Sequence, residues 1–115
     1  MVNNQSVALD RVFHALAHPA RRTMLRQLAE GECNLTELAE PLRMSFVAAS
    51  KHVRVLERAK LVRRRKVGRT HLCRMETKPV EDALKWIETW RQTWEANYDR
   101  LDSVLEELKT KLKKS

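Results

Sequence analysis

The chain has 115 residues, of which 43% are hydrophobic and 33% are charged, and its formal net charge is +8. This length suits one domain with a modest core, and the hydrophobic content is too high for a disordered chain. No apolar run approaches the roughly 20 residues that a membrane span requires, and the N-terminal MVNNQSVALDRV lacks the apolar core of a signal peptide. We therefore expect a cytoplasmic protein that does not associate with membranes.

The positive charge is concentrated in one third of the chain. Residues 41–78 contain twelve Lys and Arg against two acidic residues, so this segment carries +10 and the remainder carries −2. A basic excess confined to one segment is typical of a surface that faces phosphate groups. The alternative interpretation is a solvated charged face.

Hydrophobic residues at helical spacing predict two helices in the first third of the chain. The first begins at Ser6 and stops before Pro19, because the residue before a proline is pushed out of the helical region. The second begins at Pro19 and ends near Gly31, which we expect to cap it in the left-handed conformation.

The next two segments form a helix-turn-helix pattern. LTELAEPLR predicts a short helix bent by Pro41, with Thr36 as its N-cap; the capping box is incomplete because Ala39 stands where a glutamate is usual. Ser45 is expected to cap the second helix, FVAASKHVRVLERAKL, whose apolar stripe consists of Ala49, Val53 and Leu56.

After this helix, the period of the pattern changes to two. LVRRRKV and THLCRME are short strand-forming runs, and Gly68 between them suits the tight turn of a β-hairpin. A helix-turn-helix followed at once by a hairpin is a winged-helix arrangement. The predicted fold is therefore mainly α, with a small β-hairpin wing and a long C-terminal helix.

From Pro79 the pattern predicts one helix of roughly 30 residues, about 45 Å long at the helical rise. Its apolar stripe needs a partner, most simply the same helix of a second subunit; packing of its first half on the chain's own core is the alternative. We expect a DNA-binding domain over residues 1–78, whose N-terminal helix also joins the dimer interface, and a dimerisation helix over residues 79–115. The expected interface residues on the last helix are Leu84, Ile87, Trp90, Trp94, Tyr98, Leu101 and Leu105.

No arrangement typical of catalysis is apparent. Ser45, Ser50 and Lys51 do not form a known nucleophile arrangement, there is no glycine-rich phosphate loop, and no pair of carboxylates falls in an apolar setting. We expect neither enzymatic activity nor a cofactor.

A recognition helix presents its N-terminal residues to base edges in the major groove of DNA. Lys51 and Arg54 can donate hydrogen bonds to guanine, and Phe46 or Val47 can contact a thymine methyl group. His52 is explained at least as well by a structural hydrogen bond as by a DNA contact. The candidate contacts on this helix, all outside its apolar stripe, are Phe46, Val47, Ser50, Lys51 and Arg54.

The wing carries four consecutive cations, Arg63 to Lys66, and Arg69 beyond the turn. Neighbouring side chains on a strand point to opposite faces, so the four cannot all reach one phosphate track. Arg69 is the best candidate for a minor-groove or backbone contact, supported by Arg65 or Lys66. Arg63 or Arg64 is expected to pair with acidic residues.

Two long stretches, taken together, resemble the bacterial ArsR (arsenic-repressor-like) winged-helix family over nearly the whole chain. They are HALAHPARRTMLRQL, with an HPxR helix start, and LTELAEPLRMSFVAASKHVRVLERAKLVRRRKVGRTHLCRM, with the recognition segment SxxxxSKHxxxLExAxLV and a glycine-containing wing. The tail WIETWRQTWEANYDRLDSVLEELK resembles the dimerising helix of a subgroup without classical metal sites. The resemblance implies a homodimer that binds an inverted-repeat operator in double-stranded DNA and represses nearby genes. A dimeric interaction module whose basic face binds RNA or an acidic partner is the alternative.

The metal-binding motifs of that family are not found in this sequence. Its thiolate pair would fall at Asn34 and Thr36, so Cys33 is one place out of register, and no histidine or cysteine follows Lys78. Carboxylates alone hold zinc weakly. We therefore expect no regulatory metal.

Cys33 and Cys73 are the two cysteines of the chain, and they lack the CxxC spacing. In winged helices the strand before the third helix lies beside the returning wing strand, which would bring the two thiols together and allow a redox-sensitive disulfide. Two buried, reduced cysteines are the alternative. The tryptophans of the last helix present a similar choice, since they could line a pocket for an apolar effector or form interface core.

Overall fold

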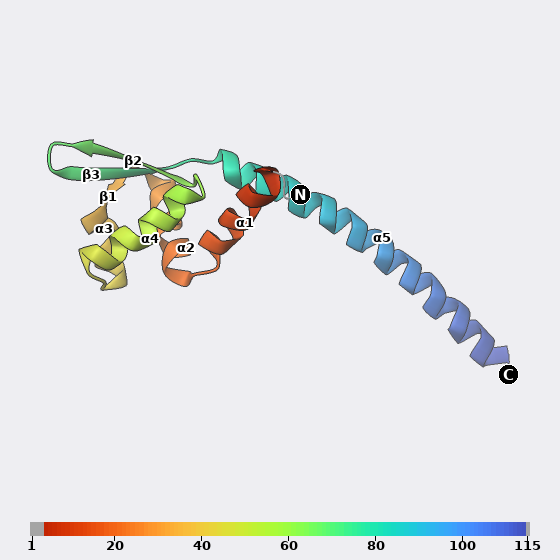
Figure 1. The fold of residues 1–115 in the computed structure, drawn as a ribbon. Coiled ribbons are helices and arrows are strands. Elements are labelled where there is room, and N and C mark those ends of the chain that lie inside the picture. The colour runs from red at the N-terminus through yellow and green to blue at the C-terminus, as the bar shows by residue number, and fades with distance from the viewer. Residues whose placement is uncertain (1–3, 115) are drawn as a thin grey trace. The chain divides into compact units, whose positions relative to one another are not determined.

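The computed structural model describes residues 4–114. Its order of elements is that of a helix-turn-helix followed by a hairpin and a long helix, as the sequence predicts (Figure 1). The elements are α1 (Asn4–Leu16), α2 (Pro19–Glu30), β1 (Cys33–Asn34), α3 (Leu35–Ala39), the 3-10 helix η1 (Glu40–Leu42), α4 (Phe46–Arg58), β2 (Val62–Val67), β3 (Thr70–Met75) and α5 (Lys78–Lys114). Within residues 4–114, no helix is both long enough and apolar enough to cross a membrane.

One hydrophobic core holds the first compact unit of the chain together. Its largest fully buried side chains come from α2, α3, α4, the connection before β2, and β3, and they are Met24, Leu35, Leu38, Val53, Leu56, Leu61 and Cys73. The first turns of α5 also contribute, because Ala83 is buried in this core and Val80 packs against it. The two units therefore divide after Ala83, about one helical turn beyond the predicted boundary at Lys78.

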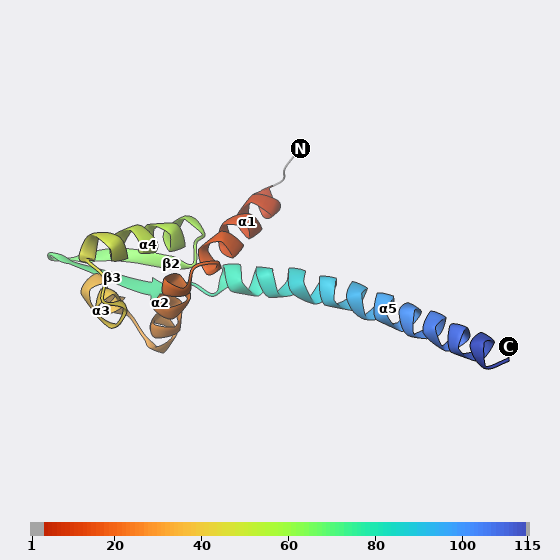
Figure 2. The same ribbon diagram turned by 90° about the horizontal axis from the view of Figure 1, so that it is seen from below.

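The three strands form an antiparallel sheet in the order β1-β3-β2. Val67 pairs with Thr70, so Gly68 and Arg69 make a two-residue turn. Gly68 has a φ of 63° and Arg69 has no positive φ, which is the pattern of a type II′ hairpin turn. Figures 1 and 2 both show this turn extending past the helices of the same unit, as expected of a wing.

Helix α3 is capped by Asn34, and not by Thr36 as predicted. The Asn34 side chain accepts a hydrogen bond from the Glu37 N–H (2.8 Å), and the Glu37 carboxylate accepts one from the Asn34 N–H (3.1 Å), which completes a capping box. The helix begins directly after β1, so the last residue of the strand is also the cap. Ser45 caps α4 as predicted, with its hydroxyl accepting from the Ala48 N–H at 3.1 Å.

Gly31 ends α2 in an extended conformation, with φ 157° and ψ 172°. The predicted left-handed cap is therefore wrong, although the Gly31 N–H still donates to the Leu28 carbonyl at 3.2 Å. The chain enters β1 two residues later, which requires extended backbone at this point.

The capping box predicts unequal effects of two neighbouring substitutions. Asn34→Ala removes a cap and should lower the free energy of unfolding by about 1 kcal/mol. Thr36→Ala is the matched control, because Thr36 is exposed and does not cap, and should change it by less than about 0.5 kcal/mol. Urea unfolding at a fixed protein concentration measures both values. Equal losses in the two variants would contradict the observed cap.

Candidate nucleic-acid interface

Helix α4 has one face in the core and the opposite face exposed. Ala49, Val53 and Leu56 are fully buried, as the apolar stripe predicts. At its N-terminus, Phe46 and Val47 are 52% and 62% exposed. Of the other candidate contacts, Lys51 and Arg54 are exposed and Ser50 is half-buried. The exposed face therefore combines apolar and cationic side chains.

Most arginines of the hairpin are held by carboxylates. Arg64 pairs with Glu57 of α4 (2.7 Å), and Arg63 and Arg74 both approach one oxygen of Glu76, at 3.3 and 3.2 Å. This confirms the prediction that Arg63 or Arg64 pairs with acidic residues. The four cations Lys51, Arg54, Lys66 and Arg69 form no ion pair with any residue between 6 and 113.

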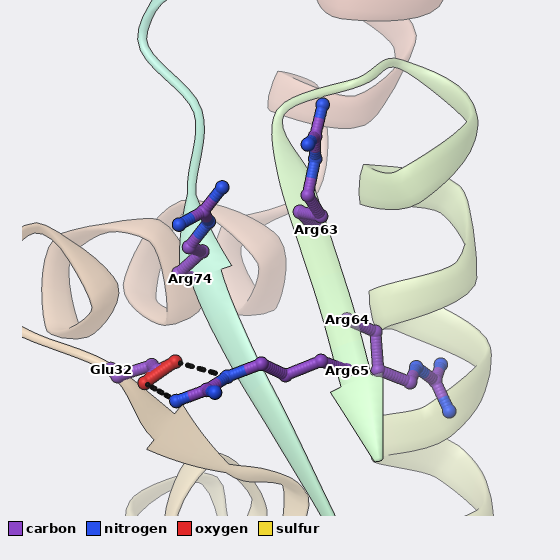
Figure 3. Close-up of a pocket in the computed structure, with 5 residues that line it drawn as sticks. All are labelled: Glu32, Arg63, Arg64, Arg65 and Arg74. Carbon is purple, nitrogen blue, oxygen red and sulfur yellow. Dashed lines mark hydrogen bonds and ion pairs between the residues drawn. The ribbon is translucent and has the colours of Figure 1, made fainter.

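Arg65 is also engaged. Its Nε and Nη2 donate to the two oxygens of Glu32, each at 3.0 Å, in a bidentate pair that lowers the pKa of Glu32 and raises that of Arg65. Figure 3 shows Arg65 reaching across β3 to Glu32, while Arg64 points to the other side of the sheet, toward α4. Glu32 and the arginines at positions 63, 64, 65 and 74 line one shallow pocket. The structure thus disfavours the predicted DNA contact of Arg65 and leaves Lys66 and Arg69 for that role.

The glutamates that form ion pairs with the arginines of the hairpin were missed by sequence reasoning. Glu32 lies 33 positions before Arg65, and it comes within reach because β1 pairs with β3 and β3 with β2. Glu57 lies on the last turn of α4, seven positions before Arg64. No spacing rule for helices or hairpins relates these positions, so the pairs depend on tertiary structure alone.

Arg21 and Arg22 brace the fold. Arg21 donates to the carbonyls of Ala15 (2.7 Å) and His14 (3.0 Å), and Arg22 donates to the carbonyl of Leu16 (2.7 Å). These are the last carbonyls of α1, which have no partner within their own helix. Of the two roles considered for His52, the structure favours the structural one, since Arg21 Nη1 lies 3.3 Å from its Nδ1.

The two cysteines face each other across β1 and β3, where Cys33 pairs with Cys73. Both are buried and reduced, and the Cys33 thiol donates to the Gly31 carbonyl at 3.5 Å. Burial raises the pKa of Cys33 and raises that of Cys73 to about 11. Among the described residues, no group of three His, Cys, Asp or Glu side chains is arranged to hold a metal ion.

The apolar stripe of α5 is exposed along its length. Each of the seven predicted interface residues is at least 40% exposed. The aromatic part forms a continuous row, with ring centroids 6.2 Å apart for Trp86–Trp90, 5.5 Å for Trp90–Trp94 and 5.7 Å for Trp94–Tyr98. Farther along, the row gives way to aliphatic side chains, namely Leu101, Leu105, Leu108 and Leu112.

Residues 16–65 match the family described as a helix-turn-helix domain. The HTH-type transcriptional regulator Rv2034 of Mycobacterium tuberculosis is 42% identical over 59 residues, which cover 51% of this chain and 55% of the relative. The chain thus spans about half the length of that curated relative.

Two solved structures have a similar fold. The crystal structure of an ArsR family transcriptional regulator aligns with a TM-score of 0.75 and 33% identity, over 83% of this chain and 97% of the other. The solution structure of the homodimeric winged helix-turn-helix domain Mb0332 from Mycobacterium bovis, titled a possible ArsR-family regulator, aligns with a TM-score of 0.60 and 24% identity, over 80% and 91%. At 24% identity this second likeness is one of fold.

Thiol chemistry offers a direct check of the strand pairing and burial. With a pKa of about 11, Cys73 carries roughly a hundredfold less thiolate at pH 8 than a free cysteine. Iodoacetamide should therefore modify Cys73 in the folded protein at least about a hundredfold more slowly than in the protein unfolded by guanidinium chloride. Comparable rates would contradict the burial of Cys73, and rapid disulfide formation with diamide would support the redox role.

Proposed function

The chain belongs to the ArsR family of winged-helix transcriptional regulators, and we propose that it is a homodimeric repressor that binds an inverted-repeat operator in double-stranded DNA. One observation supports this proposal above the others. On α4, the side chains opposite the buried stripe are exposed and cationic or apolar, and the cations Lys51 and Arg54 have no carboxylate partner among residues 6–113.

Helix α4 is proposed to choose the DNA sequence. Lys51 and Arg54 can donate to the N7 and O6 atoms of guanine, the commonest specific contact of cationic side chains in the major groove. Phe46 and Val47, at the first turn of the helix, can contact thymine methyl groups. Ser50 is half-buried beside them and can donate to or accept from either base or phosphate.

The wing is proposed to contribute to affinity for DNA but not to sequence specificity. Lys66 and Arg69 lie at the end of β2 and in the turn, and neither has a carboxylate partner among residues 6–113. Contacts of such cations with phosphates or with the minor groove fix the register of a protein on DNA. Arg65 is left out of this set because Glu32 occupies its guanidinium.

The stripe of α5 is proposed to pair with the same stripe of a second subunit. Its residues follow steps of three and four, which place them on one side of the helix, and an exposed stripe of this size is typical of a protein interface. Helix α1 is proposed to contribute to the same interface. The homodimeric state of the structurally similar Mb0332 domain supports this arrangement. The proposed interface residues are Leu84, Ile87, Trp90, Trp94, Tyr98, Leu101 and Leu105.

The different roles proposed for α4 and the wing predict different effects of mutations in them. Arg54→Ala should weaken discrimination at one base pair of the operator by about 1–3 kcal/mol, whereas Arg69→Ala should weaken binding to all DNA sequences by a similar factor. Arg74→Ala is the matched control, because Arg74 is held by Glu76 and should change affinity least. Gel shifts with the operator and with single-base variants, each at two salt concentrations, measure these effects.

The same experiment separates the operator hypothesis from its alternative. If Arg54→Ala and Arg69→Ala behave alike on every DNA tested, α4 does not choose the sequence. Tighter binding to RNA than to any duplex, at both salt concentrations, would favour a module that recognises phosphates alone.

The proposed interface predicts a loss of dimers on a single substitution. Leu101→Glu places a charge in the apolar stripe and should convert the protein to monomers at micromolar concentration, because an unpaired buried charge costs several kcal/mol. Ser103→Glu, on the opposite side of α5, introduces the same charge and should leave the dimer intact. Sedimentation equilibrium measures both masses, and a dimeric Leu101→Glu protein would exclude this stripe as the interface.

A further inference from the structure

Two sequence motifs that are far apart in the chain meet in the structure. Arg21, from the HPxR motif at the start of α2, lies beside His52, from the SKH motif of α4. Arg21 is only 8% exposed although it is charged. Its three nitrogens are directed to Ala15 O, His14 O and His52 Nδ1, so one guanidinium joins the end of α1, the start of α2 and the middle of α4.

The direction of these hydrogen bonds fixes the protonation of His52. A guanidinium can only donate, so His52 Nδ1 must accept and the ring proton resides on Nε2. Beside it, the Nδ1 of His18 accepts from the Ala20 N–H at 3.1 Å. The two rings lie 4.6 Å apart. The Arg21–His52 bond between α2 and α4 therefore requires a neutral His52.

We propose that Arg21 positions the recognition helix through His52, and that tight binding to the operator requires the neutral form of His52. This inference rests on the proposed function. His52 directly follows Lys51 in α4 and precedes Arg54 by two positions. A bond that fixes the rotation and height of α4 at His52 thus also fixes the two side chains that are proposed to read the bases.

The surroundings of His52 oppose a second positive charge. The charged or titratable groups that face it are Arg21 of α2 and His18, which caps α2, while α1 contributes backbone carbonyls to Arg21. No carboxylate among the described residues pairs with Arg21. Burial, followed by the charges of His18 and Arg21, lowers the pKa of His52. A protonated His52 would also direct an N–H at a donor, so its bond to Arg21 would break.

The sign of the pH effect distinguishes loss of the Arg21–His52 bond from the general increase in DNA attraction that protonated histidines would cause. Protonation of histidines makes a protein more positive, and that alone strengthens its attraction to DNA. Loss of the Arg21–His52 bond acts in the opposite direction, because it releases α4 from its position. Operator affinity should therefore decrease as the pH falls through the pKa of His52 in the folded protein, which lies below the ordinary histidine value of roughly 6.5.

The fold itself is expected to lose some stability over the same range. Because the pKa of His52 is lower in the folded state than in the unfolded state, the unfolded chain binds the proton more readily. The contribution of His52 to stability is complete above about pH 6.5 and is lost as the pH falls toward its folded-state pKa. Binding must therefore be measured where unfolding curves show that the protein is still folded.

The test compares the full-length wild-type chain with His52→Asn. The Asn side-chain oxygen can accept from Arg21 near the position of Nδ1, but it does not titrate. The probe is a fluorescein-labelled duplex carrying the site that the wild-type protein selects from random DNA, beside a scrambled duplex, and anisotropy gives the affinity at pH 7.5 and pH 5.5. We expect wild-type affinity for the selected site to be weaker at pH 5.5 than at pH 7.5, because part of His52 is then protonated, and His52→Asn affinity to stay the same or rise.

Three outcomes would overturn the inference. They are tighter wild-type binding at pH 5.5, an equal loss in His52→Asn, or a wild-type ring that nitrogen NMR shows to be protonated on Nδ1 at pH 7.5. The NMR measurement does not depend on the variant, so it holds even if His52→Asn is unstable. A wild-type protein that prefers no sequence at pH 7.5 would instead contradict the proposed function.

Discussion

The burial of one face of α4 is the constraint from which the proposed interface follows. Ala49, Val53 and Leu56 are fully buried, and the valine and leucine each contribute about 1.5–3 kcal/mol by leaving water. Because these residues recur at helical spacing, their burial fixes the rotation of α4 about its axis. Lys51 and Arg54 are then held outward by the same packing that stabilises the core, and the Arg21–His52 bond is proposed to refine the position that this packing sets.

The second constraint is the pairing of arginines with a few carboxylates. By sequence, the basic segment from residue 41 to residue 78 looks uniform. In the structure, Glu32, Glu57 and Glu76 engage the arginines at positions 63, 64, 65 and 74, while Lys51, Arg54, Lys66 and Arg69 have no such partner within residues 6–113. The cations without partners lie on α4 and at the end of the hairpin, so fewer cations are available to bind phosphates than the composition suggests.

Periodicity was sufficient to predict the order of the elements, because the change from a helical period to a period of two is a local property. The Ser45 cap and the hairpin turn at Gly68 were predicted for the same reason. The features that were wrong or missed depend on contacts between distant parts of the chain. Asn34 caps α3 because β1 ends there, Arg65 binds Glu32 because β1 joins the hairpin, and Arg21 reaches His52 because α2 packs on α4.

Helix α4 is proposed to choose a DNA sequence while the wing adds attraction to any sequence. The most direct test is to incubate the purified protein with random duplex DNA at moderate salt and to sequence the fragments it retains. We predict an enriched inverted repeat whose half-sites lie about one helical turn, roughly 34 Å, apart. Retained fragments that share no sequence would contradict the claim, because a surface that recognises phosphates alone selects none.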